Sequence, residues 1–222
     1  MDVCIEMSGL GRRFGSSWVL SGLNLTVRKG ESIALFGSNG SGKSTLLRVL
    51  ATLLAPSTGY LKILGLDASQ KREIRKKVCL LAHEKQLYES LTVMENMQLA
   101  AGLRGLGSRE EGILLSLLER LKIADRRDQR VGELSEGLKK RLVFARLLLG
   151  DVTGDLELML LDEPHPALDQ EGREILNSLM MEWKQQGKTI LIASHDQEET
   201  LRFVDRAFVL ENGRWMNDGK PS

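Results

Sequence analysis

The sequence has little cysteine and almost no net charge. Its 222 residues include only Cys4 and Cys79, which lie far apart and match no metal-ligand spacing. This favours reduced, packed thiols of a cytosolic protein over a disulfide framework. The 31 basic residues are balanced by 30 acidic ones. Such a balance creates no strong field toward nucleic acid or an anionic membrane surface, so we expect no nucleic-acid partner.

Long hydrophobic runs are also missing. No stretch approaches the roughly 20 apolar residues that span a bilayer, and the N-terminus lacks a basic segment followed by a long apolar run. We therefore expect no part of the chain to cross a membrane by itself. With 42% hydrophobic residues, the chain still has enough apolar side chains for a sizeable core. Its length suits one α/β domain with a smaller inserted subdomain.

The pattern along the chain predicts where strands and helices lie. Residues 27–36 end in an apolar, β-prone run, and residues 42–54 then place apolar side chains at helical spacing. Further β-prone runs begin at Gly59, Lys76, Asp155, Lys188 and Arg206. The runs around residues 158–161 and 189–193 are apolar almost throughout, as in parallel strands buried on both faces. Helical stretches lie between these runs, and from about residue 83 to 150 the strands vanish and helix-forming sequence dominates. We therefore expect a core of about residues 1–82 and 151–222 and an inserted helical subdomain of about residues 83–150.

The strongest motif is "GSNGSGKS", which fits the phosphate-loop pattern of Gly, four residues, Gly, Lys, Ser. Glycines let backbone N–H groups close around phosphate oxygens, while Lys43 supplies a charge to the β and γ phosphates and the Ser44 hydroxyl reaches Mg²⁺. The sequence therefore predicts a bound nucleoside triphosphate with Mg²⁺. The expected contacts come from Gly37, Ser38, Asn39, Gly40, Ser41, Gly42, Lys43, Ser44 and Thr45.

Polar side chains follow two later apolar runs. Asp162 and Glu163 end the run "LELMLLDE", and His195 follows "ILIAS". Beside a phosphate loop, we interpret Asp162 as a ligand of Mg²⁺, mostly through its water shell, and Glu163 as the general base. His195 reaches the same end of a parallel sheet, where it can contact the γ-phosphate and orient the attacking water.

The stretch "GELSEGLKKR" reads as a helix start, with Ser135 as its cap and the small Gly137 two residues later. A helix N-terminus carries unpaired N–H groups and a partial positive charge, so it can bind a phosphate. A plain structural cap is the commoner role. The stretch alone leaves both readings open.

In their order, the motifs "GSNGSGKS", "LSEGLKKR", "LMLLDEP", "ALD" and "IASHD" resemble the ATP-binding subunits of ABC transporters over nearly the whole chain. The resemblance implies a P-loop NTPase fold with an N-terminal antiparallel β region and hydrolysis of ATP to ADP and phosphate. It also implies a homodimer, or a heterodimer with a related subunit, in which Ser135 and Gly137 face the γ-phosphate bound to the partner. Phe14 matches the aromatic residue that stacks on adenine.

The resemblance further implies ABC permease subunits as partners, and a peripheral place on the cytoplasmic face of the inner (cell) membrane. Two departures bear on activity. Glu136 stands where the family usually has a small residue, and its carboxylate should repel a triphosphate unless it is turned away. His83 stands where the family has a Gln that links γ-phosphate and metal to the helical lobe, which gives His83 a metal-binding or linking role.

The stretch "LAHEKQLYESLTVMENM" is similar to the ATPase of the haem exporter for cytochrome c maturation. This narrows the expectation to an exporter, with haem as one cargo. ATPases of drug or polysaccharide exporters share the pattern and remain alternatives. A non-transport ABC ATPase acting on nucleic acid or ribosomes is a rival of another class, and a third is a binding-only regulatory domain.

Overall fold

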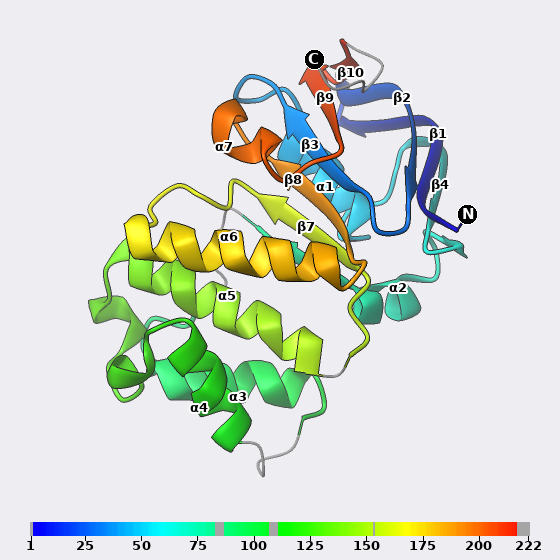
Figure 1. Cartoon of the computed structure of the whole chain (residues 1–222). Helices are drawn as coiled ribbons and strands as arrows, with labels where there is room; N and C mark the ends of the chain where they lie inside the picture. Colours follow the sequence, from blue (N-terminus) through cyan, green and yellow to red (C-terminus); the bar gives the residue numbers. More distant parts are fainter. Residues whose placement is uncertain (1, 83–86, 107–110, 153, 217–222) are drawn as a thin grey trace. The chain divides into compact units, whose positions relative to one another are not determined.

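The structure is a computed structural model that describes residues 2–82, 87–106, 111–152 and 154–216 (Figure 1). It divides into two compact units. The first comprises Met1–His83, Leu156–Pro164 and Met180–Ser222, and the second comprises Glu84–Asp155 and His165–Leu179. Within the described ranges, no helix is long and apolar enough to cross a membrane.

A four-stranded antiparallel sheet opens the first unit, with strand order β2-β1-β4-β5. Its strands are β1 (Val3–Phe14), β2 (Ser17–Arg28), β4 (Thr58–Ile63) and β5 (Leu66–Asp67). Buried Leu23, Leu25 and Val27 alternate with exposed residues along β2, the pattern of a sheet with one face on the core. This sheet is the expected N-terminal antiparallel region.

A six-stranded sheet has the order β10-β9-β3-β8-β7-β6. Its strands are β3 (Ser32–Phe36), β6 (Val78–Leu81), β7 (Leu158–Asp162), β8 (Thr189–Ala193), β9 (Arg206–Glu211) and β10 (Arg214–Trp215). All neighbours pair in parallel except β10, which pairs antiparallel with β9. Every residue of β3, β7 and β8 is buried, which explains why these runs are continuously apolar.

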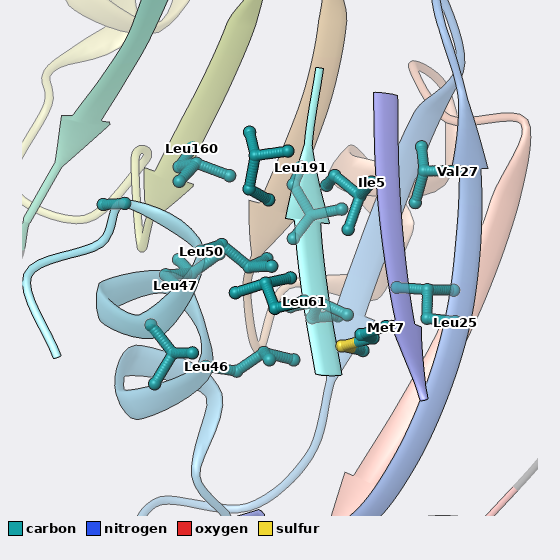
Figure 2. Packing of buried hydrophobic residues seen from close by; sticks show 14 of the residues in the cluster. Ile5, Met7, Leu25, Val27, Leu46, Leu47, Leu50, Leu61, Leu160 and Leu191 are labelled. Atoms are coloured by element: carbon teal, nitrogen blue, oxygen red, sulfur yellow. The ribbon is translucent and has the colours of Figure 1, made fainter. Parts of the chain in front are cut away.

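The helices of the first unit are α1 (Lys43–Leu50), α2 (Lys71–Lys77) and α7 (Gln197–Leu201). Figure 2 shows Leu46, Leu47 and Leu50 of α1 in one buried cluster with residues of both sheets, including Ile5 and Leu191. The sequence pattern extended this helix to residue 54, but α1 ends at Leu50. Thr52 takes a left-handed φ of 57° and its carbonyl accepts a hydrogen bond from Arg75, which turns the chain out of the helix.

Helices make up the second unit. They are α3 (Val93–Leu103), α4 (Glu111–Arg120), the short 3-10 turns η2 (Ala124–Arg126) and η3 (Val131–Glu133), and α5 (Glu136–Val152). Helix α6 (Gln170–Gln185) begins in this unit, and its last turns belong to the first. A capping box starts α3, in which the Thr92 hydroxyl accepts from the Glu95 N–H and the Glu95 carboxylate accepts from the Thr92 N–H.

Candidate functional site

Three neighbouring parallel strands, β3, β8 and β7, end at the same edge of the large sheet. The glycine loop from Gly37 follows β3, His195 follows β8, Asp162 ends β7, and Glu163 comes directly after it. The carboxyl ends of parallel strands form the usual ligand crevice of an open α/β sheet. The fold therefore places the polar residues that the sequence singled out along one edge, with β8 between the other two strands.

Glycine is required in the loop at two positions by space as well as by backbone conformation. Gly37 has a φ of 146°, and a Cβ there would collide with the Leu210 carbonyl oxygen. Gly42 has a φ of 111°, and its Cβ would lie 2.8 Å from Leu20 Cδ2. The loop is thus held against its surroundings by backbone that only glycine tolerates.

Lys43 points its ammonium group into the loop. Its Nζ donates hydrogen bonds to the carbonyl oxygens of Gly37, at 2.7 Å, and Ser38, at 3.1 Å. The side chain is only 7% exposed. Because the ammonium keeps three donors, a phosphate oxygen can join or replace these carbonyl acceptors without moving the lysine backbone.

Glu163 and His195 are in direct contact. Nδ1 of His195 lies 2.9 Å from Oε2 of Glu163, and the Glu163 N–H donates to the Ala193 carbonyl oxygen at 2.9 Å. Glu163 also has a φ of 48°, a left-handed conformation that is uncommon outside glycine. This left-handed residue directly follows Asp162, which is buried at the end of β7.

Phe14, at the end of β1, is 47% exposed. The Arg12 guanidinium carbon lies 4.6 Å from the centroid of its ring, and Arg12 also donates to the Ala55 carbonyl oxygen. One face of the ring is therefore occupied by a cation. Trp18 is paired with Arg13 instead, at 5.9 Å.

Ser135 caps α5 as expected. Its Oγ accepts a hydrogen bond from the Leu138 N–H at 3.4 Å. Gly137 packs closely, since a Cβ there would lie 3.0 Å from the Ala167 carbonyl oxygen. Gly137 thus has a packing role within the second unit that is independent of any phosphate.

Comparisons with known proteins agree with this geometry. Residues 20–166 match the protein family described as ABC transporter. The chain belongs to this family. The Nod factor export ATP-binding protein I of Rhizobium sp. (strain N33) is 36% identical over 99% of this chain and 71% of its own length. This confirms an ABC-type ATPase cassette with the expected mixed α/β fold.

Solved ABC cassettes are similar in structure as well. The ATP-binding subunit of an ABC transporter superimposes with a TM-score of 0.85 at 29% identity, over 96% of this chain and 88% of the other. A dimeric ATP-binding cassette in a post-hydrolysis state, bound to ADP and Pi, gives a TM-score of 0.84 at 25% identity, over 96% and 97%.

The sequence did not predict one ionic network of the ABC cassette. Buried Arg141 of α5 donates to Asp169 at 2.6 Å and to Glu171 at 2.9 Å. Burial alone would lower the pKa of Arg141, but the two carboxylates outweigh it and raise that pKa. The only sign of this network in the sequence is that Arg141 stands among residues of α5 that are otherwise apolar and buried.

His83 lies outside the described residues of this ABC cassette, so its expected metal or linking role stays a prediction. The roles of the other site residues also stay predictions, although the fold brings the glycine loop, Glu163 and His195 to one edge. Phe14 lies at the end of β1 in the same unit. Ser135 and Gly137 belong to the other unit.

Proposed function

We propose that the chain is the ATP-hydrolysing subunit of an exporter and powers transport through separate membrane permease subunits. The observation that carries this proposal is the arrangement of the glycine loop, His195 and Glu163 at the ends of three adjacent parallel strands. The match to Nod factor export proteins supports export in particular.

The chain's own groups bind the triphosphate. Backbone N–H groups of the glycine loop and the Lys43 ammonium hold the β and γ phosphates, and the exposed ring of Phe14 stacks on adenine. Ser44 and Asp162 offer a hydroxyl and a carboxylate, the hard oxygen donors that suit Mg²⁺. When bound, Mg²⁺ neutralises charge on the phosphate oxygens.

Glu163 acts as the general base. Its carboxylate accepts a proton from the water that attacks the γ-phosphate. His195 holds this carboxylate at 2.9 Å and orients the water. Proton transfer to a positioned base contributes about 10²- to 10⁴-fold to the rate.

Two cassettes complete each site in this proposal. The Ser135 hydroxyl accepts one hydrogen bond inside α5 and keeps its own proton, which it can donate to the γ-phosphate bound by a partner chain. The α5 N-terminus adds its partial positive charge. The dimeric ADP-bound cassette of similar fold supports a dimer for this chain.

Mixing two inactive chains tests this arrangement. One carries Lys43→Ala with an intact Ser135, and the other carries Ser135→Arg with an intact Lys43. Neither homodimer has a working site, whereas a mixed dimer has one, so single-turnover hydrolysis should reappear on mixing. If verified mixed dimers stay inactive, Ser135 does not act on the partner's nucleotide.

We propose permease subunits as the partners and the cytoplasmic face of the inner membrane as the location. Purification of the tagged full chain from membranes of its host should yield a stoichiometric membrane protein, whose identity would also indicate the cargo. Recovery with ribosomes or DNA would favour the nucleic-acid rival. Steady-state phosphate release that Lys43→Ala removes would exclude the binding-only reading.

Haem export is a narrower prediction that rests on the stretch ending in "LTVMEN". The structure gives these residues local tasks, since Thr92 and Glu95 form the capping box and Asn96 bonds both the N–H and the carbonyl of Tyr88. Their presence therefore says little about cargo.

If haem is the cargo, deletion of the gene should stop covalent haem attachment to c-type cytochromes but spare b-type cytochromes. Normal c-type cytochromes would reject haem as the cargo.

A further inference from the structure

Glu136 brings a negative charge to the place where this chain would meet a partner's phosphates. It lies between Ser135 and Gly137, at the first position of α5. An acidic residue in the first turn stabilises the helix through the helix dipole. The same charge repels a nucleoside triphosphate that approaches the helix N-terminus. In the sequence, Lys139 and Lys140 lie three and four positions after Glu136, at the spacing where side chains of a helix can pair.

The structure shows how the charge is balanced. Nζ of Lys139 lies 3.4 Å from Oε1 of Glu136, one turn along the same helix, and 3.1 Å from Oε1 of Glu89. The Lys139 side chain is only 12% exposed, whereas Glu136 is 63% exposed. The lysine is therefore the packed member of the cluster, and it holds the more exposed Glu136 carboxylate toward the body of α5.

We propose that Lys139 is a positioning residue that turns the Glu136 carboxylate back and neutralises it, so that α5 can receive the partner's triphosphate. This inference rests on the proposed function of Ser135 in the partner's site. Lys139 itself does not touch the nucleotide. Exposed ion pairs contribute little to stability in water, but closure of a dimer excludes water and strengthens both the pairing and the repulsion that it prevents.

The Lys139→Met variant tests the inference in the full chain. Met keeps most of the buried stem and removes the charge. We expect KM for MgATP to rise about 5- to 10-fold with kcat nearly unchanged, because the repulsion acts on assembly of the site rather than on the chemical step. The ATP concentration that half-saturates dimer formation in a Glu163→Gln background should rise by the same factor.

The double variant Lys139→Met/Glu136→Gly is the decisive comparison. Removing the carboxylate should restore KM and dimer formation to the wild-type range, since no charge then needs balancing. Lys122→Met is a matched control, because Lys122 also lies in the second unit and pairs with an exposed carboxylate, Glu171. It should leave both readouts unchanged.

An unchanged KM in Lys139→Met, or a rise that Glu136→Gly does not restore, would overturn the inference. The second result would mean that Lys139 acts through Glu89 or through packing alone. Ser135→Arg in the same dimer assay separates this failure from a failure of the proposed function. If Ser135→Arg blocks dimer formation while Lys139→Met does not, only the role of Lys139 is rejected.

Discussion

His195 Nδ1 lies 2.9 Å from Glu163 Oε2, although the two residues follow different strands. A neutral imidazole has a single N–H. When Nδ1 donates it to Glu163, Nε2 offers only a lone pair and cannot donate to a phosphate. The γ-phosphate can therefore gain a hydrogen bond from His195 only if the ring takes up a second proton or releases Glu163.

Replacing Glu163 with Gln should separate binding from hydrolysis. The amide keeps a hydrogen-bonding group for His195 but cannot accept the proton of the attacking water, so kcat should fall about 100-fold or more. Affinity for MgATP should persist, and ATP should trap a dimer. Phosphate-release kinetics and gel filtration would measure the two effects. Near wild-type turnover would remove Glu163 from the role of base.

Phe14→Ala should raise KM for ATP by about 5- to 150-fold and change kcat little, since stacking on a base is worth about 1–3 kcal/mol and acts on binding. Phe14→Tyr, which keeps a flat ring, should stay near wild type. Trp18→Ala is the matched control because Trp18 is similarly exposed but pairs with Arg13. A larger effect at Trp18 would reassign the stacking residue.

Leu50→Ala should destabilise the protein by about 2–5 kcal/mol, because Leu50 is fully buried and its loss leaves a cavity against the sheet. Leu53→Ala, three residues on at a 51% exposed side chain, should change the free energy of unfolding by less than about 0.5 kcal/mol. Urea denaturation at pH 7 would measure both. Equal losses at the two positions would contradict the packing shown in Figure 2.

Asp169→Asn should lower the free energy of unfolding at neutral pH but not in acid. Hydrogen bonds from Arg141, and then from the Gly172 N–H, hold the Asp169 pKa below its usual value. Such a group stabilises the native state above its unfolded pKa of about 3.9, and the contribution is lost as pH falls through the lower native pKa. The urea midpoint of the variant should therefore lie below wild type at pH 7.

This gap in urea midpoint should narrow as the pH is lowered toward 3. Asp128→Asn is the control, since Asp128 is exposed and pairs with its neighbour Arg127, and it should show a negligible gap at every pH. A gap for Asp169→Asn that stayed constant with pH would mean that its hydrogen bonds, rather than its charge, carry the effect.

The sequence by itself determined the features that depend on neighbouring residues. Closely spaced glycines before Lys43 indicated the glycine loop, and continuous apolar runs indicated the buried parallel strands. The capping role of Ser135 depends only on the first turn of its own helix. Because parallel strands end at a common edge, the chain also indicated that Glu163 and His195 would meet. These are local rules of backbone conformation and strand direction.

Only the tertiary structure decided which residues distant in sequence form ion pairs with helix α5. Arg141 meets Asp169 across 28 positions, and Lys139 meets Glu89 across 50. The order that places β8 between β3 and β7 cannot be read from the order of strands along the chain either. Each of these depends on how helices and strands pack. A charged residue on a helix has many possible partners within the length of its side chain, and only the packed backbone selects one.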